Sequence, residues 1–253
     1  MKATGAFVVT GANKGIGFET VRELGKRLNL KEAAIVLCSR TLAAGDSAIS
    51  SLAKEGIIAD LELLDITDRR SRRNFIFSLQ NKYKHVACLV NNAGIAFRPG
   101  LIKPLAEQAK ATCDVNYYGT RDITIGLAPL FGNNAKVIFL TSNLENAGPP
   151  FMSRSNRDRL LSNTVTVKTA VIGLTAALAR QAEKGTLNPD AEGIIITACY
   201  PGWCKTDMAG WEIPPLSAAD GGKVVAQLVL GAGRREHGKL VVEGREIKTP
   251  SQL

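Results

Sequence analysis

The amino-terminal part of the chain combines a short apolar run, a glycine-rich turn and an amphipathic stretch. Residues 6–9 form the apolar run and are predicted to be a buried strand. Glycines follow at positions 11, 15 and 17, and apolar residues then recur at roughly helical spacing. This order is typical of dinucleotide binding, because glycines let the backbone approach a pyrophosphate at the positive end of a helix. The alternative is an ordinary strand-to-helix turn that happens to be rich in glycine.

Apolar runs alternate with helical patterns along most of the chain. The seven expected strands are 6–10, 34–39, 59–64, 86–90, 136–141, 193–199 and 239–242. The expected helices include 69–82, 105–130, 166–184 and 218–230. This pattern predicts an α/β fold, a doubly wound parallel sheet of the Rossmann type with about seven strands and helices on both faces. Since no repeat or linker divides the sequence, we expect a single domain over 1–253, with a lid-like loop at 143–163 that is rich in Asn, Arg, Ser and Pro.

The composition is ordinary for a soluble globular protein, with 45% hydrophobic and 22% charged residues. The apolar runs are too short to span a bilayer, and the first strand begins too early to leave room for a signal peptide, so we expect a cytoplasmic protein. Five scattered cysteines are expected to be reduced thiols, and two distant histidines suggest no metal site.

The formal net charge of +9 is compatible with nucleic acid, an acidic surface or a phosphorylated ligand as partner. No nucleic-acid recognition motif accompanies the charge, so we expect no nucleic-acid partner. The densest basic run, 69–73, is expected to be the solvated face of a helix.

The end of the second expected strand indicates which dinucleotide is bound. NAD-specific folds usually place an acidic residue here to bind the ribose 2′-hydroxyl, but no acid occurs between positions 33 and 44. Arg40, together with Lys14 in the glycine turn, is instead suited to a 2′-phosphate, which favours NADP. Asp65 and Ile66, after the third strand, are placed to contact the adenine edge, although a helix N-cap region is an alternative for Asp65.

Two motifs together resemble the short-chain dehydrogenase/reductase family: Thr-Gly-Ala-Asn-Lys-Gly-Ile-Gly at 10–17 and Asn-Asn-Ala-Gly at 91–94. The longer segments 91–97, 116–122 and 200–210 look like those of the NADPH-dependent carbonyl reductases. The resemblance covers the chain from residue 6 to about residue 242. It implies hydride transfer from NADPH to the carbonyl of an aldehyde, ketone or quinone.

The resemblance also implies roles for individual residues. Ser142 matches the serine that orients the carbonyl, Lys168 the lysine that holds the nicotinamide ribose, and Asn116 the asparagine that supports a water chain. The implied cofactor-binding residues are Gly11, Asn13, Lys14, Gly15, Ile16, Gly17, Arg40, Asp65, Ile66, Asn92, Ala93, Gly94, Lys168, Pro201, Gly202 and Thr206.

The proton-donating tyrosine of the family is missing. Its position, four residues before Lys168, holds Thr164, and no tyrosine occurs between Ser142 and Lys168. An aliphatic hydroxyl is a far weaker acid than a phenol, and loss of general acid catalysis typically costs about 10²–10⁴ in rate. We therefore expect an impaired reductase; the alternative is a non-catalytic NADP-binding sensor or interaction protein. The resemblance implies that Tyr117, Tyr118 and Tyr200 have structural roles. The alternative is that one of them replaces the missing tyrosine as proton donor.

The substrate region and the carboxyl terminus allow weaker predictions. An apolar wall for an aromatic or quinone-like carbonyl is expected from Phe97, Leu144, Phe151, Trp203, Met208 and Trp211, unless the two tryptophans simply pack their loop. Relatives often pair through the helices around Asn116 and Lys168, so an oligomer is an open alternative. The last three residues, Ser251-Gln252-Leu253, resemble a peroxisomal address, which gives a second expectation for localisation.

Overall fold

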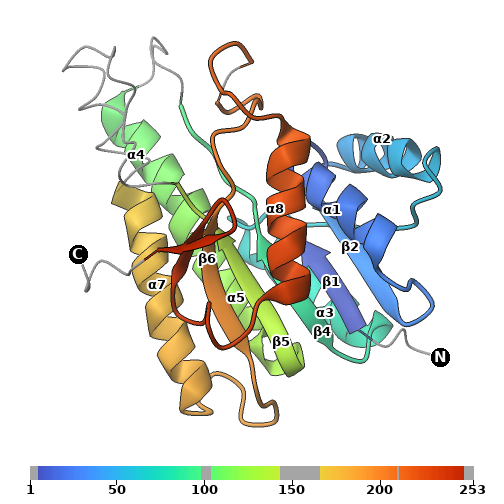
Figure 1. Ribbon diagram of the computed structural model, residues 1–253, viewed down its shortest axis with the longest axis vertical. Helices are drawn as coiled ribbons and strands as arrows, with labels where there is room; N and C mark the ends of the chain where they lie inside the picture. The colour runs from blue at the N-terminus through green and yellow to red at the C-terminus, as the bar shows by residue number, and fades with distance from the viewer. Residues whose placement is uncertain (1–4, 98–103, 143–165, 210, 248–253) are drawn as a thin grey trace.

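The computed structural model describes residues 5–97, 104–142, 166–209 and 211–247 (Figure 1). Its eight strands form one sheet in the order β3-β2-β1-β4-β5-β6-β7-β8, and every pair from β3 to β7 is parallel. The strands are β1 (Gly5–Val9), β2 (Ala33–Ser39), β3 (Asp60–Leu63), β4 (Val86–Asn91), β5 (Phe131–Leu140), β6 (Ile195–Tyr200), β7 (Leu240–Val242) and β8 (Arg245–Ile247). The order reverses between β1 and β4, which confirms the predicted doubly wound parallel sheet.

Helices cover both faces of this sheet (Figure 1). One core packs the sheet against α1 (Gly15–Arg27), α2 (Leu42–Ala53) and α8 (Ala218–Gly231). The other core packs it against α3 (Arg69–Lys82), α5 (Thr120–Leu127) and α7 (Thr166–Glu183). Neighbouring strand residues point to opposite faces, so Leu89 joins one core while Cys88 and Val90 join the other. This two-sided burial explains why the strands are nearly continuous apolar runs.

All seven expected strands are present, and two details of the sheet differ from the prediction. The sheet has an eighth strand, β8, which pairs antiparallel with β7. In addition, β5 begins at Phe131, five residues earlier than expected. The polar pair Asn133-Asn134 suggests a turn, and Asn134 does have a left-handed φ of 57°. Its amide nevertheless donates to Glu192 O at 2.7 Å, so pairing with a distant segment keeps it in the strand.

The stretch expected to be helical at 105–130 is helical throughout, but it is not one uniform α-helix. It consists of α4 (Leu105–Cys113), a π-helical turn η1 (Asp114–Gly119), α5, and a short 3-10 turn η2 (Ala128–Leu130). A Cβ at Gly119 would lie 2.7 Å from Ile66 O, so the helix passes very close to the loop after β3. π-turns inside helices are frequent at functional sites, and this one contains Asn116.

Helix α3 has the predicted bounds, but two details differ. Its N-cap is Asp68, whose carboxylate accepts from Arg70 N at 2.8 Å, so Asp65 is not the cap. The expectation that 69–73 is a solvated face holds for Arg69, Arg70 and Arg73, which are exposed, but not for Arg72. The Arg72 guanidinium donates to Ile66 O at 2.7 Å and pairs with Asp122 at 3.1 Å, with only 15% of its side chain exposed.

Several expected properties can be compared with the described residues. All five cysteines are free, and Cys38, Cys88 and Cys199 are buried. Among the described helices, none is long and apolar enough to cross a membrane. Within the same residues, no group of three His, Cys, Asp or Glu side chains could hold a metal ion.

Candidate active site

The glycine turn between β1 and α1 is built so tightly that side chains would not fit. Gly11 and Gly15 have φ values of 60° and 61°, in the left-handed region that favours glycine. A Cβ on Gly11 would lie 2.9 Å from Ala93 Cα, and a Cβ on Gly17 would collide with the side chain of Asn92. The turn is therefore shaped by close approach to the segment that follows β4.

Thr10 and Asn92 join these two segments by hydrogen bonds. Asn92 Nδ2 donates to Thr10 O at 2.8 Å and to Gly11 O at 3.0 Å. In return, Thr10 Oγ1 accepts from the backbone amides of Asn92 at 3.1 Å and Ala93 at 3.0 Å. The two motifs that identify the sequence pattern are thus one structural unit at the carboxyl ends of β1 and β4.

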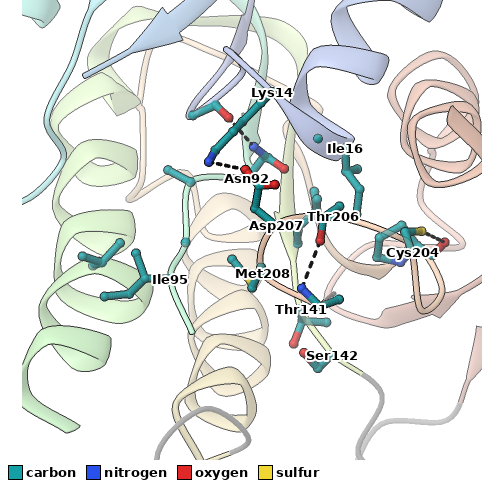
Figure 2. A pocket seen from close by; sticks show the side chains of 18 of the residues that line it. Lys14, Ile16, Asn92, Ile95, Thr141, Ser142, Cys204, Thr206, Asp207 and Met208 are labelled. Carbon is teal, nitrogen blue, oxygen red and sulfur yellow. Dashed lines mark hydrogen bonds and ion pairs between the residues drawn. The ribbon is translucent and has the colours of Figure 1, made fainter. Parts of the chain in front are cut away.

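A cavity of about 390 Å³ lies over this unit, at the carboxyl ends of the strands (Figure 2). This is where open α/β sheets bind ligands, and the volume is typical of a ligand site. The cavity is lined by every predicted cofactor-binding residue except Gly17, which is buried beneath the turn. It is also lined by residues that no prediction assigned to the site, among them Thr67, Ile95, Thr141, Cys204 and Asp207.

The amino terminus of α1 opens toward this cavity with the properties of an anion site. Lys14 is the N-cap residue, its side chain caps no backbone amide, and the first turn carries no acidic residue. Together with the left-handed Gly15, this leaves the first-turn amides and the helix dipole available to a phosphate. The residues present therefore fit the pyrophosphate of a dinucleotide.

The cations Lys14 and Arg40 line the cavity together with Asp65 and Ile66, the pair predicted to contact adenine. Partial burial opposes ionisation of Asp65, but hydrogen bonds from Thr67 and the charge of Arg40 lower its pKa overall. The Thr67 backbone amide and hydroxyl both donate to Asp65 Oδ1, at 2.9 and 2.7 Å. Asp65 is thus an ionised, rigidly held acceptor.

Ser142 and Lys168 line the same cavity, so the structure brings these two predicted catalytic residues together. Ser142 follows the end of β5, and Lys168 lies in the first turn of α7. Lys168 Nζ donates to Leu140 O at 2.7 Å, and Thr141 Oγ1 donates to Lys168 O at 3.2 Å. These bonds fix the start of α7 against the end of β5. Thr164 lies outside the described residues.

Lys168 has an unusual charge state for a lysine. Removal of its ammonium group from water lowers its pKa from 10.5 to about 8. Its ammonium donates to the carbonyl oxygen of Leu140, so a backbone dipole stabilises the charge. The group can therefore exchange protons near neutral pH.

Asn116 does not line the cavity but supports its wall from behind. Its Nδ2 donates to Ile95 O, and its Oδ1 accepts from Ile95 N, both at 2.8 Å. Asn116 is buried, and Ile95 itself faces the cavity. The structure therefore assigns Asn116 a positioning contact with the segment that follows β4.

Comparison with known sequences identifies the protein family. The family described as short chain dehydrogenase matches residues 6–214. The chain belongs to the short-chain dehydrogenases. Carbonyl reductase [NADPH] 1 of Bos taurus is 31% identical, with 95% of this chain and 97% of that protein covered. Carbonyl reductase [NADPH] 3 of Mus musculus is 33% identical, with 80% and 82% covered.

Solved structures share the fold of this short-chain dehydrogenase. A short chain dehydrogenase from Burkholderia cenocepacia in complex with NADP has a TM-score of 0.75 at 22% identity, covering 96% of this chain and 98% of its own. Salutaridine reductase from Papaver somniferum has a TM-score of 0.72 at 21% identity, covering 93% and 99%.

The expected apolar wall is only partly found among the described residues. Trp203, Met208 and Trp211 line the cavity, whereas Phe97 is not among its lining residues. Phe97 is half-buried in the segment after β4 and does not extend into the cavity. Leu144 and Phe151 lie outside the described residues. Of the predicted wall residues that the structure describes, those that line the cavity thus all come from the loop after β6.

An ion pair that sequence reasoning missed crosses the cavity. Lys14 Nζ lies 2.6 Å from Asp207 Oδ2, which joins the glycine turn to the loop after β6 (Figure 2). Asp207 lies in the segment that resembles carbonyl reductases, yet nothing in its spacing indicates a partner 193 residues away. The pair is well exposed, so its intrinsic contribution is small.

The ion pair between Lys14 and Asp207 gives a first prediction, because an anionic ligand bound by Lys14 would compete with Asp207. Replacing Asp207 with asparagine is expected to tighten NADPH binding about two- to fivefold at low salt, because Lys14 is released. The gain is expected to disappear in 0.5 M NaCl, where surface charges are screened. Fluorescence titration measures both affinities, and Asp190→Asn, an exposed change away from the cavity, is the control. Weaker binding in Asp207→Asn at low salt would contradict the competition.

Proposed function

We propose that this short-chain dehydrogenase reduces carbonyl groups of aldehydes, ketones or quinones with NADPH. The observation that carries the proposal is one cavity that combines a phosphate-binding helix terminus, two cations, and the pair Ser142 and Lys168. The similarity to carbonyl reductases named for NADPH supports the same chemistry. Bound NADPH supplies the hydride, and the protein holds the reactants and manages the proton.

We infer that the residues at the carboxyl ends of the strands divide the cofactor among them. The glycine turn and the amides that begin α1 bind the pyrophosphate. Arg40 and Lys14 bind the 2′-phosphate, while Asp65 and Ile66 contact adenine. The nicotinamide carboxamide is bound by Pro201, Gly202 and Thr206. These residues line the cavity after β6, which is separated from β2 in the sheet by β1, β4 and β5.

The catalytic residues act on the carbonyl oxygen in this proposal. The Ser142 hydroxyl donates a hydrogen bond that orients the oxygen and stabilises its developing charge. Lys168 holds the ribose and supplies positive charge close to the same point. Asn116, through its paired bonds to Ile95, keeps the wall in place. These roles are supported by the position of Ser142 and Lys168 on the same cavity and by the contact of Asn116 with Ile95, which lines it.

We further propose that the enzyme is slower than family members that carry the Tyr-x-x-x-Lys pattern, because Thr164 stands at the tyrosine position. The same substitution favours a second candidate, a non-catalytic NADP-binding sensor or interaction protein. Both candidates require NADPH binding. They differ in turnover, since only the reductase consumes NADPH in the presence of a carbonyl.

The test measures NADPH consumption with a panel of quinones, aldehydes and ketones, alongside NADPH binding by fluorescence. The reductase predicts steady consumption, with aromatic carbonyls favoured because Trp203, Met208 and Trp211 line the cavity. Binding without consumption for every carbonyl would favour the sensor instead. Absence of NADPH binding would contradict both candidates.

Arg40 gives a sharper prediction about the cofactor. Replacing Arg40 with alanine is expected to weaken NADPH binding about tenfold and to leave NADH binding unchanged, since only NADPH carries the 2′-phosphate. Arg70→Ala, on the exposed start of α3, is the matched control and should change neither affinity. An equal loss for both cofactors would mean that Arg40 does not recognise the 2′-phosphate.

Localisation can be tested directly. The carboxyl-terminal tripeptide lies outside the described residues, so the peroxisomal alternative to the cytoplasm stays a prediction. A reporter carrying Ser251-Gln252-Leu253 at its carboxyl terminus should colocalise with peroxisomes if the tripeptide is an address. A diffuse reporter would favour the cytoplasm.

A further inference from the structure

Carbonyl reduction needs a proton donor, and the chain has few groups that could serve. Hydride addition leaves a negative charge on the former carbonyl oxygen, which must then be protonated. The chain has four tyrosines, and all of them lie at described positions. Of these four phenols, Tyr200 alone lines the cavity.

The other three tyrosines have different surroundings. Tyr83 is buried at the end of α3, where its hydroxyl donates to Asp60 at 2.6 Å. Tyr117 packs against the hydrophobic core beside α5. Tyr118 is 48% exposed and stacks with the guanidinium of Arg121. None of them is positioned to serve a ligand in this cavity.

Strand pairing places Tyr200 beside the candidate catalytic residues. Tyr200 is the last residue of β6, which pairs with β5 so that Leu140 lies opposite Cys199. The pairing extends one step further, because Thr141 N donates to Cys199 O at 2.8 Å. Tyr200 therefore stands next to the turn that carries Ser142. Lys168, bound to Leu140 O, approaches the same strand ends from α7.

The Tyr200 ring is held between the cavity and an apolar cluster. It packs against the cluster of Ile172, Ala198 and Leu240 while also lining the cavity. Ile172 lies four residues after Lys168 in α7, so both residues are on the same helix face. The backbone of Tyr200 is fixed as well, since Glu243 N donates to its carbonyl oxygen at 2.9 Å.

We propose that Tyr200 donates the proton to the carbonyl oxygen in place of the missing tyrosine. The inference rests on the proposed function. The hydride forms a C–H bond at the carbonyl carbon, the C=O π pair moves to oxygen, and that oxygen takes the proton of the Tyr200 hydroxyl. NADPH is oxidised, the carbonyl is reduced to an alcohol, and the Tyr200 phenolate regains a proton from water.

The electrostatic surroundings suit an acid rather than a base. Burial and the nearby carboxylate of Glu243, with a further contribution from Cys204, raise the pKa of Tyr200. The phenol therefore stays protonated at neutral pH, ready to donate to a far more basic alkoxide.

Tyr200→Phe tests the inference because it removes only the hydroxyl and keeps the ring in its cluster. We expect kcat with 1,4-naphthoquinone to fall by about 10²–10⁴. NADPH affinity and the melting temperature should remain as in the parent. The exposed Tyr118→Phe is the matched control and should leave kcat unchanged.

A second measurement does not depend on turnover. In protein labelled with ¹³C at tyrosine Cζ, the signal absent from Tyr200→Phe is assigned to Tyr200. Addition of oxidised NADP and 1,4-naphthoquinone, which cannot react together, should shift this signal and leave that of Tyr118 in place.

The possible outcomes separate the inference from the function on which it rests. If the parent turns over and Tyr200→Phe keeps its kcat, Tyr200 is not the donor although the reductase assignment stands. An unmoved Tyr200 signal while the quinone is bound leads to the same conclusion. If the parent binds NADPH but reduces no carbonyl, the reductase function itself is wrong.

Discussion

Replacing Lys168 with methionine is expected to stabilise the cofactor-free protein by about 1–3 kcal/mol at pH 7 while lowering carbonyl reduction at least about a hundredfold. The stabilisation follows from desolvation, which lowers the folded-state pKa of Lys168 from 10.5 to about 8. Methionine keeps the length and apolar character of the side chain and removes the desolvated charge. The loss of the bond to Leu140 O offsets part of the gain.

The unfolded state binds the proton of Lys168 more tightly than the folded state does, and this difference sets how the free energy of unfolding changes with pH. Below pH 8 the ammonium is charged in both states, so its desolvation cost is fully present. Between pH 8 and 10.5 the folded state releases the proton first, and the parent becomes relatively more stable as the pH rises. The advantage of Lys168→Met should therefore shrink over this interval.

Urea unfolding at pH 7, 8.5 and 9.5 measures this difference between the two proteins. Lys136→Met is a useful control, because Lys136 is also half-buried and bound to backbone carbonyls, those of Val229 and Leu230. Lys136 does not line the cavity, so its replacement should leave carbonyl reduction intact. If Lys168→Met is less stable than the parent at all three pH values, the buried ammonium of Lys168 does not destabilise the folded protein.

Replacing Thr164 with tyrosine is expected to raise kcat by about 10–10², a part of the range that a positioned general acid provides. The sequence places this residue four positions before Lys168, where the family resemblance implies a phenol. Thr164→Phe is the matched control, since it adds the ring without the hydroxyl. We expect no gain from the phenylalanine.

The same substitution should change how much Tyr200 matters. If a phenol at position 164 supplies the proton, then Tyr200→Phe is expected to cost less than about tenfold in the Thr164→Tyr background. A full loss in both backgrounds would mean that Tyr200 acts independently of position 164. Single-turnover measurements of NADPH oxidation for the four proteins complete this double-mutant cycle.

The fold of this protein was largely predictable because its signals are local. The glycine turn, the seven apolar runs and the bounds of α3 depend on residues close in sequence. The errors occurred where a distant segment decides the local structure. Asn133-Asn134 continues β5 because Asn134 bonds to Glu192, and the helix at 105–130 contains a π turn where it passes Ile66.

It was also predictable that most of the proposed cofactor-binding residues would line one cavity, since they follow strand ends in recognisable motifs. The catalytic half of the candidate site was less predictable. The role of Asn116 in a water chain stays a prediction, and spacing alone did not indicate that its side chain bonds to Ile95 behind the cavity wall. Phe97 looked like a wall residue but does not line the cavity. The direction in which a side chain points depends on packing that spacing alone does not specify.

The sequence by itself determined the sheet, the glycine turn between β1 and α1, the cations Arg40 and Lys14, and the absence of tyrosine at the four positions before Lys168. Those features depend on residue type and on neighbours within a few positions. Only the tertiary structure decided that Lys14 pairs with Asp207 across 193 positions, that burial lowers the pKa of Lys168, and that Tyr200 borders the cavity. These properties arise when parallel strands bring their carboxyl ends to one edge, where desolvation and charge act between residues far apart in the chain.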